Sequence, residues 1–311
     1  MEICQHDSSH TGYSQTLYAT GTWGLSYEYI QNSLYTGFYV SGYQGTATDM
    51  YIPTYYAGVP VLYVSSNVFR GNTQITSIFF GNNVKWIKSG SFENCTALRS
   101  VIFSDSVKEI RDSAFKGCTN LESVIFGSGL LKIGAEAFRF CESLTTLIIS
   151  DGVQQIGNDA FGRAYGLTRA IVPDSIVSMG EGVFYMSSEL SIYCKSASAK
   201  SGWHSEWQAG NKAVYWAGEW HMNGDQPQPH CYGEWQQITA PSWTEKGLQE
   251  RYCPVCGHTD RQEIEALGHE YGEWETVTPA TCTVKGNEKR ICAVCGHEEH
   301  LDTDALGHTL G

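Results

Sequence analysis

The sequence is poor in charge. Lys, Arg, Asp and Glu together make up 17% of its 311 residues, against roughly 25% in an average soluble domain. The net charge is −13 at pH 7, and Lys and Arg form no cluster. Binding to a phosphate backbone depends on clustered cations that release counterions, so nucleic acid is excluded as a partner.

Long apolar runs are also absent. None approaches the ~20 residues that a helix needs to cross a bilayer. Met1 is not followed by the basic segment and apolar stretch of a secretory signal, so either the protein is cytosolic or the sequence begins after a removed signal. The sequence ends just after Leu306-Gly307-His308, within a recurring pattern, and we interpret it as a fragment trimmed at both ends.

Common catalytic motifs are missing as well. The sequence has no Gly-x-Ser-x-Gly elbow, no phosphate-binding loop and no His-Glu-x-x-His. Scattered carboxylates such as Glu109 and Asp112 are explained by solvation. These absences disfavour an enzyme.

What the sequence does have is a repeat of 23 residues. Aliphatic residues stand eight and five residues before each Phe and six after it. One unit of this length cannot bury its own apolar residues, so units stack and each register becomes a ladder. We predict a β-strand per coil, as in 100–103, and a short helical turn, as in 112–118, with the Phe pointing inward. The recurring phenylalanines are Phe69, Phe92, Phe115, Phe138, Phe161 and Phe184.

The coil that contains Phe138 carries a family signature. Ile133-Gly134, Ala137-Phe138, Cys141 and Leu144 match the pattern of the BspA-like leucine-rich-repeat proteins, which this sequence resembles from about Leu25 to Trp216. The resemblance implies a β-rich α/β leucine-rich-repeat solenoid with 23-residue coils. Because an open solenoid end exposes core and strand edges, we expect caps at both ends of a domain spanning 1–219.

Three cysteines share one register of the repeat: Cys95, Cys118 and Cys141. Adjacent coils lie about 4.8 Å apart, so distance alone permits disulfides, but three is an odd number. We interpret the column as small buried side chains that fill a corner of the coil. A redox or nucleophilic role is the alternative.

The outward face of the predicted strands is apolar. Strand alternation places one residue of each coil outside, next to two that face the core. An exposed apolar stripe is unusual on a soluble monomer and indicates a binding surface. The alternatives are the general preference of β-branched residues for strands and a homodimer contact. The stripe consists of Phe79, Ile102, Ile125, Ile148 and Ile171.

A second repeat, of 39 residues, follows the solenoid. Tyr-Gly-Glu-Trp, Cys-x-x-Cys-Gly-His and Ala-Leu-Gly-His each occur twice at this spacing. The Pro- and Gln-containing stretch 220–229 reads as a linker. We therefore predict two small repeats, 230–269 and 270–311.

The Cys and His residues of the tail predict structural zinc, which favours four N/S ligands in a tetrahedron. We assign Cys282, Cys292, Cys295 and His308 to the second repeat, with His297 and His300 as competitors for the last place. The first repeat offers Cys253, Cys256 and His269, with Cys231 or His230 as a fourth. The alternative is a disulfide in each repeat, because modules this small need a staple of some kind. The tail resembles zinc-ribbon-like repeats.

The sequence is compatible with three functions. The resemblance implies a secreted or cell-surface adhesin that binds a host or matrix protein, mucin or glycan. The second is a structural module that self-associates through the apolar stripe. The third is a carbohydrate-active enzyme built from Trp203, Trp207 and Glu206, although packing at the end of the solenoid explains those aromatics more simply.

Overall fold

The computed structural model describes residues 22–210, 212–224 and 226–307. The chain divides into two compact units, Met1–Pro229 (unit 1) and His230–Gly311 (unit 2).

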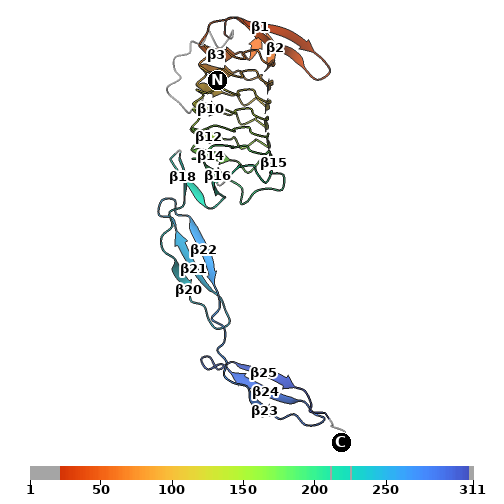
Figure 1. Cartoon of the computed structure of the whole chain (residues 1–311), viewed down its shortest axis with the longest axis vertical. Coiled ribbons are helices and arrows are strands. Elements are labelled where there is room, and N and C mark those ends of the chain that lie inside the picture. The colour runs from red at the N-terminus through yellow and green to blue at the C-terminus, as the bar shows by residue number, and fades with distance from the viewer. Residues whose placement is uncertain (1–21, 211, 225, 308–311) are drawn as a thin grey trace. The chain divides into compact units, whose positions relative to one another are not determined.

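Unit 1 is a solenoid with a ladder of parallel strands on each of two sides (Figure 1). The first ladder begins with an antiparallel hairpin, and β4 (Tyr55–Tyr56) pairs with its third strand. It consists of β1 (Leu25–Gln31), β2 (Thr36–Tyr43), β5 (Val59–Val64), β7 (Trp86–Ile87), β9 (Glu109–Ile110), β11 (Lys132–Ile133), β13 (Gln155–Ile156) and β15 (Ser178–Met179).

The second side carries two four-stranded sheets, one above the other. The upper sheet consists of β3 (Asp49–Ile52), β6 (Ser77–Phe80), β8 (Ser100–Ile102) and β10 (Ser123–Ile125). The lower sheet consists of β12 (Thr146–Ile148), β14 (Arg169–Val172), β16 (Ser191–Cys194) and β17 (Ala213–Tyr215).

The core of unit 1 is a stack of rings. The recurring phenylalanines are 0–2% exposed, and neighbouring rings are stacked with centroid distances of 4.7 to 5.9 Å. Aliphatic columns fill the space around them. The 23-residue period and the buried registers follow the sequence prediction.

The corner that holds each Phe is not helical, which corrects the α/β prediction: among residues 22–307, apart from 211 and 225, the chain has strands and turns but no helix. The Phe92 N–H donates to the Ala114 carbonyl at 2.8 Å, and Phe115 donates to Ala137 at 2.8 Å. The backbone donors are thus used between coils, whereas an α-helix would direct them to the carbonyl four residues back. The residues two positions before and two positions after each Phe have a left-handed backbone conformation, as at Ser113 (φ 57°) and Gly117 (φ 75°). This conformation turns the N–H groups toward the next coil.

Aromatic residues close the lower end of the solenoid. Trp203 and Trp207 are 7% and 4% exposed and lie edge to face at 5.1 Å. The stretch interpreted as a linker forms the hairpin β18 (Trp220–Asn223) and β19 (Gln226–Pro229). The Trp220 indole N–H donates to the Cys194 carbonyl at 3.0 Å, which holds the hairpin on the last coils.

Unit 2 contains two three-stranded antiparallel sheets. We call the chain around the first sheet the first tail module and the chain around the second sheet the second tail module. Within 230–307 the only buried apolar residues are Cys253 and Cys292, so neither sheet has a hydrophobic core. The first sheet is β20 (Gln236–Thr239), β21 (Gly247–Tyr252) and β22 (Thr259–Ile264). The second is β23 (Glu275–Thr278), β24 (Gly286–Ile291) and β25 (Glu298–Thr303). In the part of the chain that the structure describes, no helix is long and apolar enough to cross a membrane.

Candidate functional site

The second ladder of unit 1 is interrupted between β10 and β12. At the coil junctions above and below, the main chain makes a regular bond: Glu122 N–H donates to Arg99 O at 2.8 Å, and Thr168 N–H donates to Thr145 O at 2.9 Å. The equivalent bond from Thr145 to Glu122 is not made in the described chain. The two strand edges that face the interruption are therefore unpaired at this point.

The far end of the same junction is open too. Phe103 N–H donates to Ile125 O at 2.9 Å, and Ile149 N–H donates to Ile171 O at 3.1 Å. Within residues 22–307 the intermediate coil makes no such bond from Phe126. The opposite ladder stays continuous, since β11 pairs with both β9 and β13. The solenoid thus opens on one side only.

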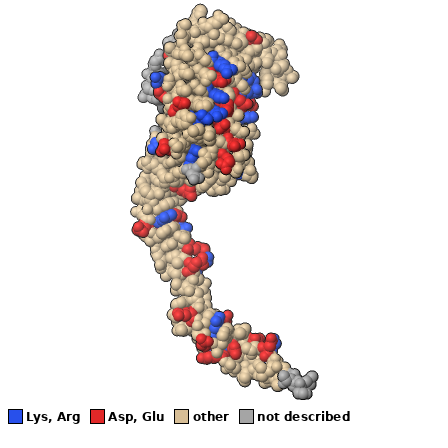
Figure 2. Space-filling view, in the orientation of Figure 1, with Lys and Arg blue, Asp and Glu red and all other residues tan. Residues whose placement is uncertain are grey.

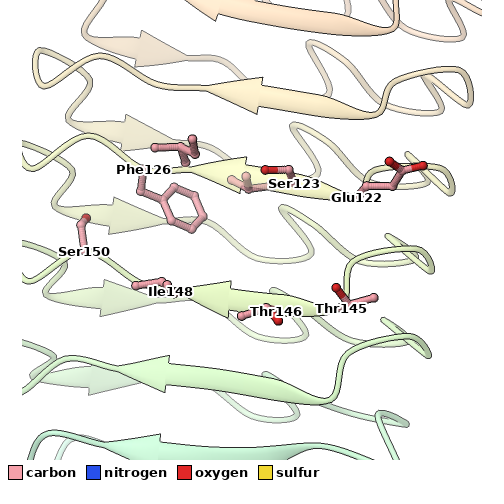
Figure 3. A pocket seen from close by; sticks show the side chains of 9 residues that line it. Glu122, Ser123, Phe126, Thr145, Thr146, Ile148 and Ser150 are labelled. Atoms are coloured by element: carbon pink, nitrogen blue, oxygen red, sulfur yellow. The ribbon is translucent and has the colours of Figure 1, made fainter. Parts of the chain in front are cut away.

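The opening forms a cleft of about 440 Å³, within the ~300–1,000 Å³ of ordinary ligand pockets. Figure 3 shows the wider spacing between the two strands and the ring of Phe126 at the cleft. Phe126 and Val124 are half-buried, whereas their equivalents in the coil above, Phe103 and Val101, are 3% and 0% exposed. The cleft therefore reaches the core.

One buried polar group at the cleft lacks a partner. In an upper coil the Ser104 hydroxyl donates to the Gly81 carbonyl at 3.1 Å. Ser150 lines the cleft, and its buried Oγ makes no hydrogen bond within the described chain. An unpaired buried hydroxyl costs about 1–3 kcal/mol, so a ligand that supplied a hydrogen bond here would recover part of that energy.

The structure shortens the predicted apolar stripe. Ile125 and Ile148 are 50% and 52% exposed and lie on either side of the cleft. Phe79 and Ile102 are half-buried. Ile171 is only 4% exposed, so this residue is not available on the surface. The sequence pattern located the stripe but could not show which part of it stays uncovered.

Charged side chains of both signs are intermixed on the face of unit 1 that Figure 2 shows. Glu136 accepts from Lys116 at 2.6 Å and also pairs with Arg139, which lies 3.6 Å from Asp159. The Lys116 and Arg139 contacts lower the pKa of the Glu136 carboxyl, although partial burial opposes the shift. Opposite charges in such a network compensate one another, which makes this a solvated face and not a field of one sign.

The three thiols of the solenoid's cysteine column are buried and form no disulfide. Cys95, Cys118 and Cys141 are 0% exposed and unbridged. Each thiol donates to a carbonyl of the preceding coil, as from Cys118 to Phe92 at 3.2 Å. Burial raises the pKa of Cys118 and of Cys141. The predicted reading as small buried side chains agrees with this geometry.

The first tail module gathers a group of metal-ligating atoms. His230, Cys253 and Cys256 have ligand atoms within 4.8 Å of one another, and His230 Nδ1 lies 3.3 Å from Cys256 Sγ. Cys231 Sγ lies 3.7 Å from Cys253 Sγ. The tight turn that follows Cys253 is closed by the Gly257 N–H, which donates to the Cys253 carbonyl at 2.8 Å.

The second module repeats this arrangement 39 residues later. His269, Cys292 and Cys295 form the group, with His269 Nδ1 3.2 Å from Cys295 Sγ. His269 therefore joins the second module, whereas the sequence analysis assigned it to the first. Sequence order alone could not show which Cys-x-x-Cys this histidine approaches.

Cys282 lies outside the second group. It precedes β24, whereas Cys292 follows this strand of six residues, which spans about 20 Å at ~3.3 Å per residue. Its carbonyl accepts from Gly307 at 3.2 Å, at the far end of the module. His308 lies outside the described residues. Of the three described members of the predicted set, the structure brings together Cys292 and Cys295.

The tail cysteines form no disulfides, and the first cysteine of each Cys-x-x-Cys favours ionisation. A disulfide would place the two sulfurs about 2.05 Å apart, well below the 3.7 Å between Cys231 and Cys253. Although burial opposes ionisation, hydrogen bonds from His230 and from main-chain N–H groups lower the pKa of Cys253 to about 5. The main-chain N–H of Cys295 is the largest cause that lowers the pKa of Cys292 to about 6.

An arginine sandwich accompanies each Cys/His group, a feature that the sequence analysis missed. The Arg251 guanidinium carbon lies 4.5 Å from the ring centroids of both Tyr232 and Trp235, and Arg251 also pairs with Asp260 at 2.8 Å. Arg290 repeats the arrangement in the second module. The signal was present in the repeated Tyr-Gly-Glu-Trp motif and an Arg at the same spacing.

Comparison with known proteins supports the fold of unit 1. Residues 63–191 match six copies of the BspA type Leucine rich repeat region. A leucine-rich-repeat protein of Treponema pallidum has a similar structure, with 25% identity and a TM-score of 0.53 over 56% of this chain and 80% of that one. This part of the chain is a leucine-rich-repeat solenoid.

Two further solved structures share less of their length with this chain. A leucine-rich-repeat protein from Bacteroides ovatus is 29% identical, with a TM-score of 0.49 over 55% of this chain and 45% of that one. A leucine-rich cell surface protein from Faecalibacterium prausnitzii is 26% identical, with a TM-score of 0.44 over 56% and 54%. The chain thus spans about half the length of each. Curated proteins give no match.

Proposed function

We propose that the chain is a non-enzymatic binding protein, secreted or at the cell surface, that recognises its partner at the cleft between β10 and β12. The observation that carries this proposal is the interrupted ladder, which combines unpaired strand edges with two exposed isoleucines. Unpaired edges in register invite main-chain hydrogen bonds from an extended segment.

A protein partner suits this cleft better than a glycan. Its apolar lining includes Ile125, Phe126 and Ile148, and Glu122 is the one charged lining residue. Apolar side chains of a host or matrix protein would be buried there, and the unpaired main chain near Thr145 and the Ser150 hydroxyl would be satisfied by its backbone. The leucine-rich-repeat match is consistent with protein binding.

The test is a binding screen of the full chain against fibrinogen, fibronectin, mucin and common glycans. We expect a saturable protein ligand that is lost when Ile125 and Ile148 are both replaced by Lys. The matched control is Val177→Lys, which changes an aliphatic residue that is 55% exposed and next to the opposite ladder. Equal binding by the double variant and the control would show that the cleft is not the site.

Self-association through the same isoleucines is the second candidate. It requires a molecular mass that rises with concentration and falls back to the monomer in the Ile125→Lys, Ile148→Lys variant. A constant monomer mass across the concentration range would remove it.

We also propose that the tail modules bind structural zinc. Two thiolates on one tetrahedral zinc, each about 2.3 Å from the ion, lie about 3.8 Å apart, close to the 3.7 Å between Cys231 and Cys253. Because neither module has a hydrophobic core, each needs a cross-link such as bound zinc for stability. Zinc here would stabilise the fold of the module.

Metal analysis of the reduced protein provides the check. We expect two zinc ions per chain, and loss of tail structure in excess chelator while unit 1 keeps its thermal transition. Disulfides, detected as the loss of two hydrogen masses per bridge in unreduced protein that lacks zinc, would contradict the proposal.

A further inference from the structure

The two Cys/His groups of the tail are not equivalent, although the modules repeat closely. In the first module the residue after the ligating histidine is Cys231, whose Sγ lies 3.7 Å from Cys253 Sγ. In the second module the corresponding residue, 39 positions on, is Glu270. The second group therefore lacks the thiol that stands beside the first.

In the described chain, no other residue of the second group takes the place of this thiol. Its ligand atoms come from three residues, His269, Cys292 and Cys295, and no carboxylate falls within the same 4.8 Å limit. Glu270 is exposed and contributes its main-chain carbonyl, which accepts from Ala293 at 3.0 Å. Cys282 is excluded because it lies beyond the other end of β24.

Within unit 2, two further contacts are the same in both groups. The contact between the histidine Nδ1 and the second cysteine sulfur is 3.3 Å in the first and 3.2 Å in the second. The histidines also stack on equivalent partners: His230 on His258 at 4.6 Å, and His269 on His297 at 4.5 Å. Among the residues of unit 2 around the two groups, the change from Cys231 to Glu270 is therefore the one that removes a thiol.

On the proposed zinc function, we infer that the first module holds zinc through four of its own residues, whereas the second supplies three and leaves one coordination position exchangeable. The first set is His230, Cys231, Cys253 and Cys256. A closed tetrahedral set is typical of structural zinc, and three protein ligands leave the fourth place to water or another donor. The open position of the second module accepts a small nitrogen donor from solution, such as imidazole.

The experiment titrates the reduced, metal-free full chain with Co²⁺, and with Zn²⁺ in competition with a chromophoric chelator. We expect two equivalents of differing affinity. Imidazole should change the Co²⁺ absorption of one equivalent only. Loss of an outer-shell partner already costs about 10–100-fold in metal affinity, so the two sites should differ by at least about 10-fold.

Substitutions at Cys231 and Glu270 test whether these two residues cause the difference in metal affinity. Cys231→Ser should weaken the first site by at least about 10-fold and make it respond to imidazole. Glu270→Cys should strengthen the second site and abolish its response. Glu270→Gln tests whether the carboxylate itself fills the fourth place, and Cys282→Ser is the matched control that should leave both sites unchanged.

The outcomes separate this inference from the zinc proposal. Two equal sites, a Cys231→Ser variant with unchanged affinity, or weaker binding in Glu270→Gln would each overturn the inference while the zinc proposal stands. No metal uptake at all would overturn the zinc proposal itself.

Discussion

Units 1 and 2 both build repeated β-structure, but different interactions stabilise them. In unit 1 each 23-residue coil adds a buried phenylalanine and several aliphatic residues to a continuous core. In unit 2 each 39-residue module buries one cysteine as its only apolar core residue within 230–307. Repetition therefore suffices for stability only where neighbours share a hydrophobic surface; otherwise each module needs its own staple.

Thiol reactivity should show the largest contrast between the units. Burial raises the pKa of Cys194 to about 12, so about one part in 10⁴ is thiolate at pH 8. Exposed tail thiols such as Cys256 and Cys295 should react with an alkylating reagent more than about 10³ times faster in metal-free protein. Peptide mapping by mass spectrometry after timed labelling measures this. Equal rates would show that the solenoid thiols are accessible.

The core of unit 1 should respond strongly to truncation. Phe115→Ala removes the centre of the ring stack, and we expect a loss of about 3–5 kcal/mol in the free energy of unfolding. Urea denaturation followed by circular dichroism gives the value. Tyr165→Ala, at a side chain that is 44% exposed, is the control and should cost far less. A Phe115→Ala effect as small as that of the control would contradict a continuous core.

Unit 2 should depend on its arginine sandwiches. Arg251→Gln removes both ring contacts and the Asp260 pair, and we expect a loss of about 1–2 kcal/mol. Arg261→Gln is the matched control, because Arg261 is 67% exposed and pairs with Glu250 on the surface. Thermal unfolding of the zinc-loaded chain compares the two. If the control costs as much, the ring contacts add nothing.

The smallest effect concerns the charge network of unit 1. The pKa of Glu136 lies below its usual value because of Lys116 and Arg139. The ion pairs of Glu136 thus stabilise the fold at a pH above the usual carboxyl pKa. This stabilisation is lost as the pH falls through the lowered pKa of Glu136. Glu136→Gln should cost less than about 1 kcal/mol at pH 7, and this cost should shrink as the pH falls below the usual carboxyl pKa. A pH-independent difference from wild type would contradict an ionic origin; Glu142→Gln, at an exposed carboxylate, is the control.

Much of the fold could be predicted because the repeat is strict. The Phe registers, the buried Cys column and the strand at 100–103 follow from period and alternation alone. The helical turn at 112–118 was wrong, because local residue types do not reveal that the amides there bond to the next coil. The Cys/His groups that could hold a metal contain the predicted residue types but another pairing: His269 lies with Cys292 and Cys295.

By itself the sequence determined the two periods, the registers that face the core, the Cys and His residues of the tail and the change from Cys231 to Glu270. Only the tertiary structure decided that Ile171 is covered while Ile125 and Ile148 stay exposed. It also decided that the ladder opens between β10 and β12. The physical reason is that a period fixes the direction of each side chain within its own coil, whereas covering and strand pairing depend on how neighbouring coils pack.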